Sequence, residues 1–99
     1  MNKFGIPDDV FAEITGVLNS DPELICVKIF GSRAKGNYKK YSDIDIAIWT
    51  NPHTDLTQDI KERLEDLDVI YRFDVVNYNS ISNSELKEHI DRVGVEILT

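Results

Sequence analysis

The sequence predicts a single domain of mixed α/β (α+β) class, in which helices pack on one face of a small mixed β-sheet. Helical and strand-like segments alternate along its 99 residues, and 41% hydrophobic with 29% charged residues is typical of a folded globular chain. In residues 43–49, an isoleucine also occupies every second position. A chain of this length removes roughly 60 to 68% of its surface from water, which suffices for one core. We therefore expect one domain over residues 1–99.

The first predicted element is an amphipathic helix over residues 7–19. Pro7 has the fixed φ of a first helical turn, and Asp8 and Asp9 place negative charge near the positive end of the helix dipole. The Asn-Ser-Asp-Pro sequence at 19–22 ends the helix. Apolar side chains recur at helical spacing, namely Val10, Phe11, Ile14, Val17 and Leu18.

Two strands and a glycine-bounded turn follow. Residues 24–30 are rich in β-branched and aromatic side chains and predict a largely buried strand, and residues 31–36 predict one helical turn between two glycines. Residues 43–49 predict a strand with two different faces. One face carries Ile44, Ile46 and Ile48, and the other carries Asp43, Asp45, Ala47 and Trp49.

The remaining elements complete the order helix, strand, turn, strand, helix, strand, helix. Residues 55–67 predict a second helix with Thr54 or Asp55 as its cap, and residues 69–77 predict a third strand. A last helix runs from Ser84 to Ile90 or Arg92, and Gly94 ends it before an apolar tail. Because the isoleucine face must be buried while the opposite face carries carboxylates, we expect the helices on one face of the sheet.

The distribution of charge limits the classes of ligand. A net charge of −7 argues against general binding to a nucleic-acid backbone. Residues 28–40 nevertheless contain no acidic residue, which indicates either a confined anion such as a nucleoside triphosphate or a solvated loop. Five of the 11 basic residues lie there: Lys28, Arg33, Lys35, Lys39 and Lys40.

No targeting or membrane signal is recognisable in the sequence. The apolar runs are far shorter than the roughly 20 residues of a membrane span, and the N-terminus lacks a basic segment followed by an apolar stretch. We therefore expect a cytoplasmic protein without a membrane partner. The lone Cys26 excludes an intrachain disulfide and a cysteine-based zinc site, and is expected to be a small buried hydrophobe.

Three aspartates are the candidate catalytic and metal-binding residues. Asp43 and Asp45 point to the same side of their strand, with Cβ atoms about 6 to 7 Å apart, and hard oxygen ligands suit Mg²⁺ or Mn²⁺. Asp74 reaches the same open side if its strand is adjacent, and a two-metal site needs such a third carboxylate. The competing interpretations are a solvated face with incidental charges and an ordinary surface pairing of Arg72 with Asp74.

Gly31 and Ser32 are candidate phosphate ligands, because backbone N–H groups and a hydroxyl lie there without an intervening Cβ. The segment is not a Walker A loop, since Asn37 and Tyr38 replace the required Lys and Ser or Thr. A Gly-x-Gly-x-x-Gly fingerprint is also absent.

The residues 31–36 together with Ser42-Asp43-Ile44-Asp45 resemble a known family motif. It is the Gly-Ser, ten residues, Asp-x-Asp motif of the DNA polymerase β-like nucleotidyltransferase superfamily. The short chain is further similar to the minimal nucleotidyltransferase (MNT) branch, the antitoxin partners of HEPN-domain toxins. One departure is Lys35, where the family more often has an arginine.

The resemblance implies roles for seven residues. Asp43 and Asp45 would ligate two Mg²⁺ ions (Mn²⁺ is an alternative), and Asp74 would complete the metal site and help deprotonate the attacking hydroxyl. The triphosphate would be bound by Gly31 and Ser32, with charge neutralised by Arg33 and Lys35.

The implied function is transfer of AMP from ATP, or of another nucleotide from its triphosphate, to a tyrosine of a cognate HEPN RNase toxin. Two alternatives stay open: a non-catalytic antitoxin that masks its partner by contact, and nucleotidyl transfer to a small-molecule hydroxyl. A chain of 99 residues has no room for a substrate-binding second domain, so the missing wall would come from a partner, a second copy (a homo-oligomer) or the acceptor. His53, His89, Tyr38, Tyr41 and Trp49 receive no role.

Overall fold

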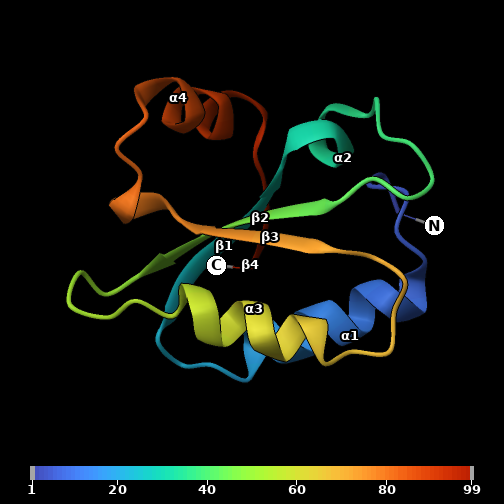
Figure 1. Ribbon diagram of the computed structural model, residues 1–99, viewed down its shortest axis with the longest axis horizontal. Helices are drawn as coiled ribbons and strands as arrows, with labels where there is room; N and C mark the ends of the chain where they lie inside the picture. The colour runs from blue at the N-terminus through green and yellow to red at the C-terminus, as the bar shows by residue number, and fades with distance from the viewer. Residues whose placement is uncertain (1, 99) are drawn as a thin grey trace.

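The computed structural model describes residues 2–98 and contains a four-stranded sheet in the order β3-β2-β1-β4 (Figure 1). The helices lie on both sides of this sheet. The elements are α1 (Asp8–Asn19), β1 (Leu24–Phe30), α2 (Gly31–Lys35), β2 (Ile44–Thr50), α3 (Thr57–Glu65), β3 (Phe73–Asn77), the 3₁₀ turn η1 (Tyr78–Ser80), α4 (Ser84–Val93) and β4 (Val95–Leu98).

The sheet is mixed, as predicted. β1 pairs antiparallel with both β2 and β4, whereas β2 and β3 run parallel and are joined through α3. In the parallel pair Ile44 lies opposite Phe73, and Asp45 lies opposite Asp74. The parallel register therefore brings two of the predicted site residues to adjacent positions on neighbouring strands.

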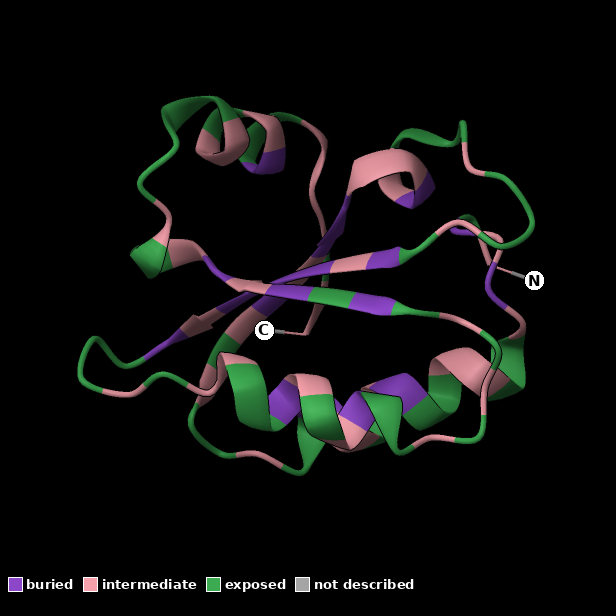
Figure 2. Ribbon diagram, in the orientation of Figure 1, coloured by how far each residue is buried: buried purple, intermediate pink, exposed green. Residues whose placement is uncertain are grey.

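The main core lies between the sheet and the pair α1 and α3 (Figure 2). Ile44, Ile46 and Ile48 are fully buried there, which confirms the predicted apolar face of β2. From the helices, Ile14 and Ile60 are equally buried. Full burial of one such side chain contributes roughly 1.5 to 3 kcal/mol, so this layer supplies much of the stability.

The opposite face of the sheet is only partly covered. α1 and α3 pack as predicted, but α4 lies on this second face, where Ile90 forms a smaller cluster with Phe30 and Ala47. The expectation that the helices lie on one face only is therefore wrong. The additional layer forms because Phe30, Ala47 and Val76 present an apolar surface beyond the carboxylates, and α4 covers it.

Two elements differ from the prediction by more than two residues. The expected third strand over 69–77 begins only at Phe73, and Ile70 before it is 69% exposed. The apolar tail after Gly94 forms the edge strand β4, paired with β1. Gly94 ends α4 without a left-handed conformation, and a Cβ there would overlap the carbonyl oxygen of Ile90. The glycine therefore permits a tight passage from α4 into β4.

Candidate active site

Gly31 brings the start of α2 against the strand that carries Asp45. Its φ is +72°, a conformation that L-residues rarely adopt, and a Cβ at this position would overlap Oδ2 of Asp45. Both observations require glycine here. The glycine–serine turn and the central aspartate are thus in direct proximity, as the spacing of the motif predicted.

The three predicted aspartates converge where β2 and β3 begin, below α2 in Figure 1. Asp45 lies opposite Asp74 in the parallel register, and Asp43 immediately precedes β2. Asp43 and Asp74 are exposed, whereas Asp45 is half-buried. The side chains of Asp43 and Asp74 therefore face solvent at the rim of the site, and the Asp45 side chain lies deeper.

Burial and the convergence of the three carboxylates raise the pKa of Asp45. The pKa of its carboxyl is raised from 3.8 to about 6, mainly by burial and further by the negative charges of Asp74 and Asp43, while the charge of Arg33 opposes the increase. Three carboxylates thus repel one another at a partly desolvated position. A divalent cation would offset this repulsion.

The donor set fits a hard divalent cation in its chemistry, because ionised carboxylates are the oxygen ligands that Mg²⁺ and Mn²⁺ prefer. Within residues 2–98, no group of three or more His, Cys, Asp or Glu side chains is already close enough to enclose a metal ion. Asp43, Asp45 and Asp74, together called the acidic floor below, therefore form an open site at which a nucleotide could supply further oxygen ligands.

Arg33, which was predicted to neutralise phosphate charge, directs its hydrogen-bond donors at backbone carbonyls rather than at this floor, although its charge lowers the pKa of Asp45. The side chain is 1% exposed. All five of its N–H groups donate to backbone carbonyl oxygens, those of Phe4, Gly5, Lys40 and Ser42. A guanidinium so buried and so occupied has no donor left for a nucleotide.

Lys28 and Lys35, two of the other basic residues of 28–40, lie on different elements. Lys28 reaches over the ring of Trp49, with its Nζ 5.4 Å from the ring centroid. Lys35 is exposed at the end of α2, and Ser32 is half-buried at its start. Of the predicted phosphate ligands, Gly31, Ser32 and Lys35 therefore keep positions from which a nucleotide could be reached.

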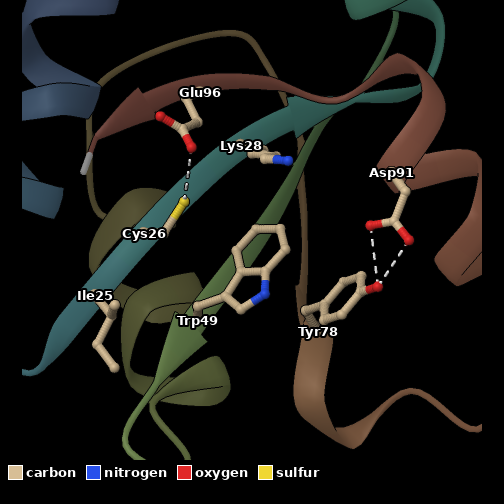
Figure 3. A pocket seen from close by; sticks show the side chains of 7 residues that line it. All are labelled: Ile25, Cys26, Lys28, Trp49, Tyr78, Asp91 and Glu96. Carbon is tan, nitrogen blue, oxygen red and sulfur yellow. Dashed lines mark hydrogen bonds between the residues drawn. The ribbon is translucent and has the colours of Figure 1, made fainter.

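Trp49 lies near the other end of β2 from the aspartates, and it packs against the α4 cluster of Phe30, Ala47 and Ile90. Its ring stacks on Tyr78 with centroids 4.7 Å apart, in a shallow pocket of about 340 Å³ (Figure 3). Tyr78 donates its hydroxyl to the carboxylate of Asp91. Cys26, expected to be buried, is only half-buried and lines this pocket, where its Sγ lies 3.8 Å from a carboxylate oxygen of Glu96.

The remaining unassigned residues also lie outside the acidic floor. His89 packs edge-on against Phe30, and His53 lines a separate polar cavity of about 250 Å³ at the far ends of β2 and β3. The ring of Tyr38 lies over the Arg33 guanidinium, whereas Tyr41 is 64% exposed.

Fold and site together define a nucleotidyltransferase type of domain, in which a glycine–serine turn faces strand-borne carboxylates. Residues 12–99 match the family model described as "Polymerase beta, Nucleotidyltransferase". The chain belongs to this family, as its motif predicted.

No helix within residues 2–98 is long and apolar enough to cross a membrane.

Among curated proteins, the chain is 40% identical over 70 residues to "Probable protein adenylyltransferase MntA" of Haemophilus influenzae. The alignment covers 69% of this chain and 60% of that relative, so the chain spans less than two thirds of the relative's length. This likeness agrees with the predicted minimal nucleotidyltransferase branch.

The solved structures with similar folds include two toxin–antitoxin complexes. A variant of the toxin–antitoxin complex MntA-HpeT contains a chain with a TM-score of 0.70 at 25% identity, covering 89% of this chain and 71% of that one. A Shewanella oneidensis complex, described as a tri-AMPylated HEPN toxin with its MNT antitoxin, matches with a TM-score of 0.63 at 20% identity, covering 90% and 71%. The second likeness concerns the fold alone.

Proposed function

We propose that this chain is a metal-dependent nucleotidyltransferase that transfers AMP from ATP to a protein hydroxyl and thereby acts as an antitoxin. The observation that carries the proposal is the convergence of Asp43, Asp45 and Asp74 beside Gly31 and Ser32. The likeness to a protein adenylyltransferase supports AMP as the transferred group. The acceptor would be a tyrosine of a HEPN RNase toxin.

The site residues would divide the work between binding and proton transfer. Asp43 and Asp45 would hold two Mg²⁺ ions, or Mn²⁺, with Asp74 completing the set; such ions polarise the phosphate and lower the pKa of a bound hydroxyl. The backbone N–H groups of Gly31 and Ser32 and the Ser32 hydroxyl would bind the triphosphate, and the exposed Lys35 would balance its charge.

The transfer itself requires one bond to form and one to break. The acceptor oxygen bonds to the α-phosphorus, the bond from that phosphorus to the bridging oxygen breaks, and pyrophosphate leaves. The hydroxyl proton passes toward Asp74, whose carboxylate is exposed at the rim where an acceptor would approach. The other side of the acceptor site would come from the partner protein or from a second copy of this chain.

Label transfer from α-³²P-ATP tests this function. Purified chain is incubated with Mg²⁺ and a candidate HEPN-domain acceptor protein, and labelled product is measured on a denaturing gel. We expect transfer by the wild type and none by the double variant Asp43→Asn/Asp45→Asn, with Asp68→Asn, at an exposed turn, as matched control. Unchanged labelling by the double variant would refute the catalytic assignment.

An assay of RNase activity, together with the label-transfer assay, separates the alternatives. A contact-only antitoxin would neutralise the RNase equally well in EDTA without nucleotide, whereas a catalytic one would require both Mg²⁺ and ATP. Label appearing on small hydroxyl compounds but not on protein would assign the acceptor to the small-molecule class.

A further inference from the structure

Arg33 is buried at the point where four separate parts of the chain meet. It extends from α2 between the N-terminal segment and the loop of residues 36–43, and the rings of Tyr38 and Tyr71 lie 5.2 and 5.0 Å from its Cζ. Tyr71 belongs to the segment that leads into β3. One side chain thus contacts every segment that leads into the acidic floor.

The hydrogen bonds of Arg33 concentrate on the residue before Asp43. Both Nε and Nη2 donate to the carbonyl oxygen of Ser42, at 3.1 and 2.9 Å. Nη2 also reaches the carbonyl of Lys40 at 3.3 Å. Because a planar guanidinium presents its donors in a rigid fork, the two bonds fix the direction of the Ser42 peptide as well as its distance.

The far side of the guanidinium anchors this arrangement to the N-terminal segment. Nη1 donates to the carbonyl of Phe4 at 2.9 Å and to that of Gly5 at 3.3 Å. Phe4 is part of the main core and is 4% exposed. The loop is therefore held against a rigid layer, although residues 36–43 contain no helix or strand.

We propose that Arg33 is a positioning residue that sets the place of Asp43 relative to the Gly31–Ser32 turn. Ser32 directly precedes Arg33, and Asp43 directly follows the carbonyl that Arg33 holds, so the side chain joins the two halves of the site across the intervening loop. The start of β2 is then tied to the approach to β3, since Ile44 N donates to the carbonyl of Arg72 at 2.9 Å. This inference rests on the proposed nucleotidyl transfer.

The substitution Arg33→Lys tests the proposal because it keeps the charge and removes the fork. Misplacing a catalytic group by about 1 Å lowers turnover about a hundredfold, so we expect kcat for label transfer to fall by tenfold or more. The KM for ATP should change less than threefold, since Arg33 does not contact the nucleotide. The matched control is Arg92→Lys, at an exposed arginine of α4 that pairs with Glu88, and its kcat should equal that of the wild type.

Two kinetic outcomes would overturn the proposal. A kcat within twofold of the wild type would show that the fork does not position the site. A tenfold rise in KM at unchanged kcat would instead show that Arg33 contacts the nucleotide. All rates are compared at a temperature at which circular dichroism shows each variant to be folded.

Hydrogen–deuterium exchange provides a readout that does not depend on activity. Arg33→Lys should accelerate exchange of the amides within residues 36–43, such as those of Lys39 and Ser42, and leave α1 unchanged. Equal acceleration throughout the chain, or none in this loop, would refute positioning even if the wild type transferred no label. A missing transfer by the wild type would refute the proposed function alone.

A second variant applies if Arg33→Lys does not fold. Tyr71→Leu removes one ring from the guanidinium and leaves all five hydrogen bonds. We expect a several-fold loss of kcat together with faster exchange in residues 36–43. If both quantities stay at wild-type values, the proposal is wrong.

Discussion

Replacing Asp45 by asparagine should stabilise the metal-free protein at neutral pH. Asparagine has nearly the same shape and no charge, so the variant removes the repulsion from Asp43 and Asp74 and the penalty of burying a carboxylate. A residue needed for the proposed chemistry is thus expected to weaken the fold that carries it.

The size of the effect follows from the pKa of Asp45. A carboxyl whose pKa lies at about 6 rather than 3.8 corresponds to about 3 kcal/mol at 1.36 kcal/mol per pH unit. Because Asp45 is only half-buried, solvent screens part of this interaction, and we expect a gain of about 1 to 2 kcal/mol.

The direction of the pH dependence is set by which state, folded or unfolded, binds the proton of Asp45 more tightly. The folded state binds it more tightly, so the free energy of unfolding of the wild type decreases as pH rises from 3.8 through about 6 and is then constant. Asparagine does not titrate in this range. The advantage of the variant should therefore be absent below about pH 4, grow between pH 4 and 6, and be complete near pH 7.

Urea denaturation in EDTA at pH 4, 5, 6 and 7.5 measures this difference, with Asp68→Asn, at an exposed turn, as control. A variant no more stable than the wild type at pH 7.5, or a difference that does not depend on pH, would refute the reasoning. Added Mg²⁺ should then stabilise the wild type more than the variant, because the ion binds the folded carboxylates.

Two further predictions concern a close approach and the core. Gly31→Ala should lower the free energy of unfolding by about 2 kcal/mol or more and abolish label transfer. Gly36 also has a positive φ, but a Cβ there would meet open space, so Gly36→Ala should lower the free energy of unfolding by only about 1 kcal/mol. Equal urea midpoints for the two variants would contradict this prediction. Ile46 is fully buried, so Ile46→Ala should lower the free energy of unfolding by about 2 to 5 kcal/mol. Ile70 is 69% exposed, so Ile70→Ala should lower the free energy of unfolding by less than about 0.5 kcal/mol. Similar losses for the two variants would contradict the position of the core described above.

The sequence predicted best those features that depend on local alternation. The two faces of β2 follow from the period of two along a strand, and the same rule placed Asp74 beside Asp45 once the strands were taken as neighbours. Gly31 and Ser32 were predicted from a motif with a fixed spacing. The faces of β2 are encoded within a few consecutive residues, and the motif within residues 31–45, whereas the place of Asp74 also required the assumption that its strand neighbours β2.

The features that were missed depend on contacts between distant segments. Arg33 lies in a basic run, so its charge suggested a phosphate ligand, whereas the carbonyls that occupy it come from 7 to 29 residues away in sequence. The tail after Gly94 has only four residues in β4, and its pairing with β1 leaves no periodic signal. The cover provided by α4 likewise depends on Phe30 and Ala47 meeting Ile90 in space.

The register of β2 links the site to the core. A shift of one residue against β3 would expose Ile44, Ile46 and Ile48 and bury the aspartates instead. Burial of those three isoleucines contributes roughly 1.5 to 3 kcal/mol each, and together about 4.5 to 9 kcal/mol, which is several times the roughly 1 to 2 kcal/mol that the charge of Asp45 is expected to remove. The hydrophobic face therefore determines where the carboxylates stand, and it does so by a margin large enough to keep three mutually repelling groups together before any cation binds.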